Sequence, residues 1–192
     1  MDYVGRFAPS PTGPLHYGSL VAAVASFLDA RHAGGKWLLR IEDLDPPRES
    51  IDAPQEIVRQ LLALGLHWDL EVLCQSSRLS SYEAALKSIQ PFTFPCTCSR
   101  KAVPDVYPGT CRLRKHLTQD RPTAVRLQVP RRSVSINDRC LGLQTWDLEK
   151  EVGDFVIKRK DGLHAYQPAV VVDDIHYSVS HIVRGNDLLD ST

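Results

Sequence analysis

The start of the chain combines a short apolar run, a proline-rich turn and a helix start, and this order most constrains the fold. Residues 3–8 are typical of a buried strand, residues 9–14 contain three prolines and a glycine, and an apolar-periodic helix begins near Ser19. A helix N-terminus leaves backbone N–H groups unpaired and favours negative charge, so such a turn is suited to an anion. His16 and Gly18 lie where a side chain can donate to phosphate oxygens and a ligand can approach the backbone. The sequence therefore predicts a phosphate-binding turn, although a plain connection is the commoner meaning of such a loop.

The next residues extend this start into a βαβ unit. A helix is expected over residues 20–31, ended by Gly34-Gly35, and a strand over residues 36–42. Strand, helix and strand in succession predict a parallel sheet with a right-handed crossover. The loop at residues 43–48 then lies at the carboxyl end of a strand, where open α/β sheets bind ligands.

The remaining elements are less regular. From residue 95 to about 114, cysteine, proline and glycine replace the periodic apolar residues, which indicates a small insertion. The stretch from about residue 130 to 150 is weakly patterned and is assigned no element, and residues 168–172 favour a strand on propensity alone. Two further helices are expected, one at 53–64 with Asp52 as N-cap and Gly65 as its stop, and one at 80–90 with the capping box Ser80-Ser81-Tyr82-Glu83. Strands are expected at 124–129 and 178–184, and a hairpin around Asp161-Gly162 is expected at 154–166.

Composition and charge restrict the class of protein. The 192 residues are 43% hydrophobic and 24% charged, which is ordinary for a soluble globular protein with one sizeable core. No apolar run approaches the roughly 20 residues that span a bilayer, and no secretory leader is visible, so we expect a cytoplasmic protein without membrane contact. With 23 basic and 23 acidic residues, charge lends no support to a wide nucleic-acid interface. The basic stretches 112–116, 131–132 and 158–160 are expected to be solvated faces.

Three of the five cysteines lie close together, which fits a reducing compartment and a metal site better than disulfides. Cys96, Cys98 and Cys111 supply three soft ligands, and zinc in a structural site takes four. The fourth candidates are Tyr107 and His116, and free thiols in a loop are the alternative. Cys74 and Cys140 have no partner in the sequence and are expected to be buried apolar residues.

Charged residues interrupt or end three of the predicted strands. Arg6 lies inside an apolar strand, Glu42 ends the next strand, and Arg184 ends the expected strand 178–184. Buried charges are costly unless paired, so each marks either an ion pair or a bound charged ligand. If the three converge, their charges suit a zwitterion with an additional carboxylate, which describes glutamate.

Ordered motifs connect the chain to a known family. Residues 6–13 (Arg-Phe-Ala-Pro-Ser-Pro-Thr-Gly), followed by His16 and Gly18, resemble the first ATP-binding motif of class I aminoacyl-tRNA synthetases of the glutamyl branch. Tyr17 and Ser19 depart from the family's His-Ile-Gly-His tetrad and leave one histidine for the phosphates. The strings 40–48, 153–159, 169–174 and 183–192 resemble the glutamyl-Q tRNA(Asp) synthetase family, and the resemblance covers essentially the whole chain.

The resemblance implies an α/β, Rossmann-like class I synthetase catalytic domain with a parallel sheet and a small zinc-binding insertion. Residues 1–94 and 117–192 would form the catalytic domain, residues 95–116 the insertion, and residues 168–172 a helix. Matching positions imply an ATP site, a glutamate site and one structural zinc. In the glutamate site, Glu42 takes the α-ammonium, and the side chains of Arg6, Arg184 and Tyr166 take carboxylate oxygens. The implied residues are His16, Gly18 and Ser19 for ATP, Arg6, Ser10, Glu42, Tyr166 and Arg184 for glutamate, and Cys96, Cys98, Tyr107 and Cys111 for zinc.

The implied activity is ATP- and Mg²⁺-dependent activation of L-glutamate and its transfer to queuosine in the anticodon of tRNA(Asp), by a monomer. The alternatives are the catalytic fragment of an ordinary glutamyl-tRNA synthetase, against which Pro46-Pro47-Arg48 argues, and a non-catalytic zinc module that binds glutamate or adenylate. The family's second ATP motif, a Lys-Leu-Ser-Lys-like loop, lies downstream of the string at 187–192. We therefore expect a chain that ends at Thr192 to be inactive or severely impaired in ATP–pyrophosphate exchange.

Overall fold

The computed structural model describes residues 2–112 and 121–191. Two compact units form: unit 1 comprises residues 1–83 and 166–192, and unit 2 comprises residues 84–165. These units do not test the predicted boundaries of the small insertion, at residues 94/95 and 116/117, which stay a prediction.

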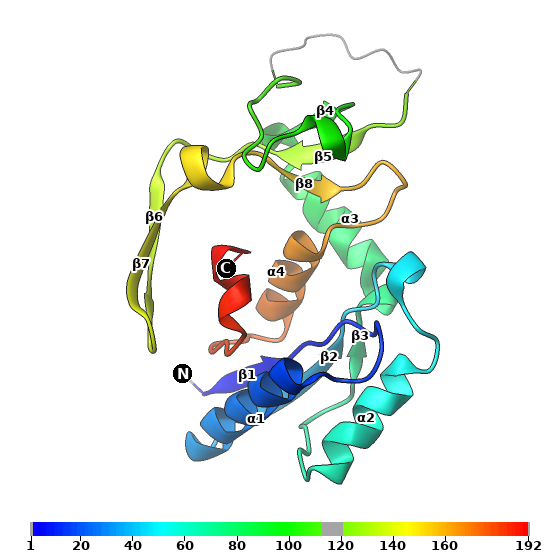
Figure 1. The fold of residues 1–192 in the computed structure, drawn as a ribbon, viewed down its shortest axis with the longest axis vertical. Helices are drawn as coiled ribbons and strands as arrows, with labels where there is room; N and C mark the ends of the chain where they lie inside the picture. Colours follow the sequence, from blue (N-terminus) through cyan, green and yellow to red (C-terminus); the bar gives the residue numbers. More distant parts are fainter. Residues whose placement is uncertain (1, 113–120, 192) are drawn as a thin grey trace. The chain divides into compact units, whose positions relative to one another are not determined.

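Unit 1 is built on the predicted βαβ motif, which the structure confirms. Strand β1 (Val4–Phe7), helix α1 (Tyr17–His32) and strand β2 (Lys36–Ile41) follow in order, and β1 pairs with β2 in parallel with Arg6 opposite Leu38. The short strand β3 (Leu73–Cys74) extends the sheet on the far side of β2. Figure 1 shows these strands side by side with α1 packed against them. The core comprises Phe7, Ala23, Ala30, Trp37, Leu39, Ile41, Ile57 and Leu61, with Tyr3 and Leu66.

Helices α2 and α3 form where helices were expected but begin differently. Helix α2 (Ala53–Ala63) has Asp52 at its N-cap position, yet the Asp52 side chain caps no backbone N–H. Helix α3 (Leu79–Ser88) continues directly from a 3₁₀ turn at Gln75–Arg78. Ser80 therefore lies inside the helix, and the predicted capping box is wrong because the preceding turn already starts the helical path.

The segment after residue 165 shows one confirmed and one wrong prediction. Helix α4 (Tyr166–His176) is the helix that the resemblance implied, against the strand propensity of its valines. Residues 178–184 form no strand. The N–H groups of Ser180 and His181 both donate to the carbonyl oxygen of Val4, so the segment meets β1 at one point and does not continue as a ladder. A 3₁₀ helix at Asn186–Ser191 follows.

Unit 2 contains antiparallel strands. Strands β4 (Thr93–Cys96), β5 (Ala124–Leu127) and β8 (Phe155–Lys158) form a sheet in the order β4-β5-β8. The expected hairpin at 154–166 forms as a short one. The N–H of Gly162 donates to the Arg159 carbonyl in the turn, and residues 157–159 pair with residues 163–165 through two backbone hydrogen bonds and the bridge between Lys158 and His164. Tyr166 already belongs to α4. A separate hairpin of β6 (Ser133–Asp138) and β7 (Gly142–Asp147), followed by a π-helical turn at Leu148–Val152, occupies the region where no element was expected.

Candidate functional site

The proline-rich turn brings its three implied ATP residues together at the start of α1. The His16 ring occupies the N-cap position, where Nδ1 accepts from the backbone N–H of Ser19 at 3.3 Å and Nε2 lies 3.0 Å from the Ser19 hydroxyl. A Cβ atom at Gly18 would lie 3.1 Å from Cε1 of His16. Any residue other than glycine would therefore displace the His16 ring slightly. His16 and Gly18 are exposed. The helix therefore starts two residues before Ser19, and the His16 ring caps the N–H of Ser19.

A network of four charges, two buried arginines and two half-buried carboxylates, lies at the carboxyl ends of β1 and β2. Arg40 donates to Asp174 on α4 at 2.5 Å and to Glu42 at 3.1 Å. Arg6 faces the same Asp174 carboxylate with two longer contacts of 3.4 Å each. Arg6 and Glu42 thus lie in one network, as their shared placement at strand ends predicts, and each is ion-paired in this structure.

Sequence analysis missed Arg40 and Asp174. Arg40 carries the same signal as Arg6, a charge inside an apolar strand, and Asp174 follows the apolar run 169–172 on the helix that the resemblance implied. Neither signal names the partner, because Arg6 and Arg40 are separated from Asp174 by 168 and 134 residues.

Burial sets the ionisation of this network. Burial lowers the pKa of Arg6 and raises the pKa of Glu42. Burial also acts to lower the pKa of Arg40, but the Glu42 and Asp174 carboxylates outweigh it and raise that pKa. Two cations and two carboxylates give a formally neutral set, which is the condition under which four charges are tolerated in a protein interior.

The other implied glutamate residues lie outside this network. Ser10 is exposed in the turn, and its carbonyl accepts from the N–H of Thr12. Tyr166 is 37% exposed at the first position of α4, and Arg184 is half-buried in the segment after α4. Within the described part of the chain, no hydrogen bond joins Ser10 or Tyr166 to Arg6 or Glu42, so their role in glutamate binding stays a prediction.

A second buried carboxylate, Asp173, holds α4 in unit 1. Its oxygens accept from Arg78 Nε at 2.7 Å, from Gln75 Nε2 at 2.9 Å and from the Tyr82 hydroxyl at 2.9 Å. Burial and the hydrogen bond to Asp173 raise the pKa of Tyr82, which keeps its hydroxyl a donor. Because Asp173 precedes Asp174, these three donors also fix the carboxylate that pairs with Arg6.

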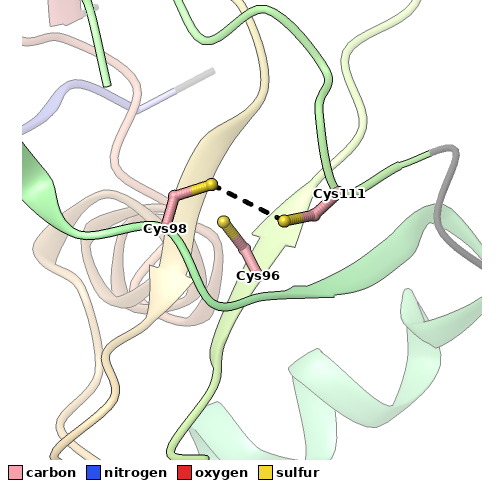
Figure 2. A group of neighbouring side chains, drawn as sticks. All are labelled: Cys96, Cys98 and Cys111. Carbon is pink, nitrogen blue, oxygen red and sulfur yellow. Dashed lines mark hydrogen bonds between the residues drawn. The ribbon is translucent and has the colours of Figure 1, made fainter. Parts of the chain in front are cut away.

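The predicted cysteine cluster is confirmed as a group that can hold a metal ion. The Sγ atoms of Cys96, Cys98 and Cys111 all lie within 4.8 Å of one another, with 3.6 Å between Cys98 and Cys111 (Figure 2). The Tyr107 hydroxyl lies 3.6 Å from the Cys96 sulfur and 3.9 Å from the Cys98 sulfur. A tetrahedral zinc with bonds of about 2.3 Å to sulfur needs neighbouring sulfurs about 3.8 Å apart, so this donor set fits zinc. His116, the other candidate ligand, lies outside the described residues.

Ionisation within the cluster is uneven. Burial opposes ionisation of Cys111, but hydrogen bonds with Tyr107, with the Thr97 backbone and with the other cysteines lower the pKa of its thiol to about 6. Burial and hydrogen bonds with Cys111 and Cys96 raise the pKa of the Tyr107 hydroxyl. A bound cation therefore has to displace a phenol proton in order to gain Tyr107 as a ligand.

Cys74 and Cys140 are not deeply buried residues. Cys74 is half-buried and Cys140 is exposed, so the prediction of burial is wrong for Cys140. Cys140 lies in the turn between β6 and β7, where its N–H donates to the Asp138 carboxylate.

Among the helices of the described residues, none has the length and apolar character needed to cross a membrane.

Comparison with known proteins connects this geometry to a family. The model for the catalytic domain of class I tRNA synthetases (E and Q) matches residues 3–101 and 109–192. Among curated proteins, the chain is 51% identical to a glutamyl-Q tRNA(Asp) synthetase of Pseudomonas fluorescens and 52% identical to one of Ectopseudomonas mendocina. The alignments cover 100% and 99% of this chain but 65% and 66% of those relatives, so the chain spans slightly less than two thirds of their length.

A solved structure agrees with this assignment. A glutamate tRNA ligase from Elizabethkingia meningosepticum, in complex with its amino acid, superposes with a TM-score of 0.88 at 26% identity, over 100% of this chain and 45% of that one. The predicted fold class, a Rossmann-like synthetase catalytic domain on a parallel sheet, is thereby confirmed. The chain belongs to the catalytic-domain family of class I tRNA synthetases of the E and Q group.

Proposed function

We propose that this chain is the glutamate-activating part of an enzyme that uses ATP to activate L-glutamate for transfer to queuosine in the anticodon of tRNA(Asp), with the activity of the 192-residue chain itself impaired. The observation that carries the proposal is the identity of 51–52%, over essentially all of the chain, to proteins named glutamyl-Q tRNA(Asp) synthetase. The buried charges at the ends of β1 and β2 support the glutamate part of it, and the His16 turn supports the ATP part.

The charge balance of the buried network suits glutamate. Arg6, Arg40, Glu42 and Asp174 are formally neutral together, whereas glutamate carries two carboxylates and one ammonium group. A further cation is therefore needed, and Arg184 is the residue that we assign to it. Glu42 takes the α-ammonium. Arg6 takes a carboxylate with Tyr166 and Ser10, because its 3.4 Å contacts with Asp174 are longer than the 2.5 Å contact of Arg40 and are easier to exchange.

The His16 turn is assigned to ATP. The N–H groups at the start of α1, with His16, Gly18 and Ser19, face the phosphates, and Mg²⁺ accompanies the nucleotide as part of the substrate. An oxygen of the glutamate α-carboxylate attacks the α-phosphorus, and the bond from that phosphorus to the bridging oxygen of pyrophosphate breaks. The protein contributes positioning and charge stabilisation to this step.

One structural zinc is assigned to Cys96, Cys98, Tyr107 and Cys111. The support is the fit of three sulfurs and a phenol oxygen to a tetrahedral donor set. Such a metal supplies folding free energy to the loops that carry its ligands.

The test measures both halves of the reaction. Glutamate-dependent ATP–pyrophosphate exchange reports activation, and transfer of radiolabelled glutamate to tRNA(Asp) with and without queuosine reports the acceptor. We expect slow exchange, and label on queuosine-containing tRNA(Asp) alone. Label on tRNA(Glu) would favour an ordinary glutamyl-tRNA synthetase, and glutamate binding in calorimetry without any exchange, even at high concentrations of the chain, would favour a non-catalytic module.

A further inference from the structure

Three of the four assigned zinc ligands lie on the long connection between β4 and β5. Cys98, Tyr107 and Cys111 follow β4, whereas Cys96 is the last residue of β4 itself. Tyr107 and Cys111 lie furthest from that strand along the chain. The phenol oxygen of Tyr107 nevertheless lies in the cluster and accepts from the backbone N–H of Cys111 at 2.7 Å. Groups outside the ligand set must therefore hold this connection in place.

Arg126 on β5 holds the ring of Tyr107. Its guanidinium carbon lies 3.9 Å from the ring centroid, and its Nη1 donates to the backbone carbonyl of Asp154 at 2.7 Å. Arg126 is only 8% exposed. Phe94, which pairs with Arg126 across the β4–β5 ladder, stacks on the same tyrosine with ring centroids 6.2 Å apart. The sheet thus offers Tyr107 a cation and an aromatic ring from adjacent strands.

Gly153 holds the backbone of the same residue. A Cβ atom at this position would lie 2.8 Å from Cγ1 of Val106 and 3.0 Å from the backbone nitrogen of Tyr107. Its φ of +67° is also one that side-chain-bearing residues rarely adopt. Only glycine therefore allows the connection to approach the segment before β8 this closely.

Asp154 holds the other ligand, Cys111, through its neighbour. The Asp154 carboxylate accepts from Nε of Arg112 at 2.8 Å and also pairs with Nη2 of Arg112. Its second oxygen accepts from the backbone N–H of Val129 at 3.0 Å, and the residue is 1% exposed. Arg112 directly follows Cys111, so this ion pair with a buried carboxylate anchors the chain at the metal ligand to the segments after β5 and before β8.

We propose that Arg126, Gly153 and Asp154 are positioning residues for the metal site, which hold Tyr107 and Cys111 in place for binding the ion. The inference rests on the zinc assignment made above. It gives a role to the Gly153-Asp154 pair, which lies about forty residues beyond the last ligand. Residues that orient metal ligands typically change metal affinity by about 10- to 100-fold when they are replaced.

The experiment uses the full 192-residue chain and measures zinc affinity by competition with a chromogenic chelator. We expect Arg126→Met and Asp154→Asn to weaken zinc binding about 10-fold or more, and Arg126→Lys, which keeps the charge but loses the planar group, to lie between them and the wild type. The matched control is Arg131→Met in the same unit. The Arg131 side chain is 80% exposed and pairs with Glu149, so affinity should stay within about twofold of the wild type.

A double substitution separates positioning from general stability. Tyr107→Phe removes the oxygen ligand and keeps the ring. If Arg126 acts through Tyr107, Arg126→Met should cost much less zinc affinity in the Tyr107→Phe background than alone. Cobalt(II) in place of zinc gives a second readout, because the intensity of its visible bands reports tetrahedral coordination, and we expect weaker bands in Arg126→Met.

The outcomes are distinct. Equal zinc affinity in Arg126→Met, Asp154→Asn and the wild type overturns the positioning role and leaves the zinc assignment standing. An equal loss in both tyrosine backgrounds also overturns it, since Arg126 would then act on stability alone. A wild-type chain that binds no zinc overturns both. Circular dichroism of the metal-free chains checks folding, and if Arg126→Met does not fold, Arg126→Lys decides by the same criteria.

Discussion

At the scale of single residues, Asp173 is the clearest case of a buried charge that organises its surroundings. Three donors satisfy its carboxylate. Asp173→Asn leaves Arg78 without a charged partner, and we expect a loss of about 3 kcal/mol in the free energy of unfolding, against about 1 kcal/mol for Tyr82→Phe. Urea denaturation measures both. The exposed Asp161→Asn is the control, and a loss at Asp173 no larger than the control's would contradict this account.

Glu42 offers a residue-scale test of the glutamate assignment. Glu42→Gln removes the carboxylate assigned to the α-ammonium, while an amide can still accept from Arg40. We expect glutamate binding in calorimetry to weaken by about 10- to 100-fold, because a hydrogen bond between charged groups is lost. The matched control is Glu56→Gln, at a partly exposed residue of α2 that pairs with Arg59. Unchanged affinity in Glu42→Gln would remove Glu42 from the site.

Asp69 predicts a dependence of stability on pH. Burial acts to raise the pKa of Asp69, but the N–H of Trp37 at 2.8 Å and Arg31 at 2.7 Å outweigh it, so the folded pKa lies below the ordinary 3.8. An acid with a depressed folded pKa stabilises the fold above its unfolded pKa, and this contribution is lost as the pH falls through the folded pKa. Asp69→Asn should therefore lower the unfolding free energy by roughly 1 kcal/mol at neutral pH, a figure discounted for partial exposure.

The pH series supplies the check on Asp69. The difference between wild type and Asp69→Asn in urea denaturation should shrink as the pH is lowered below 3.8. A difference that stays constant over this range would mean that the charge of Asp69 contributes nothing, and that only its shape matters.

At the scale of elements, local sequence patterns predicted the helices and strands that are stabilised by local interactions. The strand–turn–helix start, β2 and α2 follow from alternation, periodicity and glycine stops. The valines of α4 favour a strand, yet this segment is a helix. The helical conformation lets Asp173 accept from Gln75, Arg78 and Tyr82. Only the family resemblance predicted it. The segment 178–184 has strand-like residues, but its hydrogen bonds to β1 involve Val4 alone among the described residues: the Val4 carbonyl accepts from the N–H groups of Ser180 and His181, and the Val4 N–H donates to the Ser180 hydroxyl.

The β6–β7 hairpin gives a prediction at this scale. Its turn depends on Gly142, at φ +72°, and on the Asp138 carboxylate, which accepts from the N–H groups of Cys140 and Leu141. Gly142→Ala should cost the hairpin about 1 kcal/mol, because alanine resists a positive φ. Amide hydrogen exchange should rise within residues 133–147 and stay unchanged in β1 and β2. Gly142→Asn, which tolerates this conformation better, should restore most of the protection, and equal exchange in both variants would contradict the argument.

At the scale of the whole molecule, ion pairs between residues far apart in the sequence limited how much of the site could be predicted from the sequence. Arg6 and Glu42 stand out because each charge belongs to an apolar strand, and the cysteine cluster stands out by its spacing. Their partners do not stand out: Asp174 pairs with Arg6 across 168 residues, and Arg112 pairs with Asp154 across 42. Local patterns identify a charge that needs a partner, whereas the fold supplies the partner.

The two units should also respond differently to loss of a metal. Among the described residues, the buried hydrophobic clusters of unit 1 contain the sheet and its helices, while the cluster of unit 2 consists of Cys96, Tyr107 and Cys111 with their neighbours. A zinc bound there would be held by the same residues that form this cluster, so its removal should open unit 2 first. A strong chelator should raise amide exchange in β4 and β5 and leave β1 and β2 protected. The control is a Cys98→Ser chain, which should exchange rapidly in β4 without chelator and respond little to it. If chelation instead raised exchange equally in both units, or in neither, the metal would not be the element that stabilises unit 2.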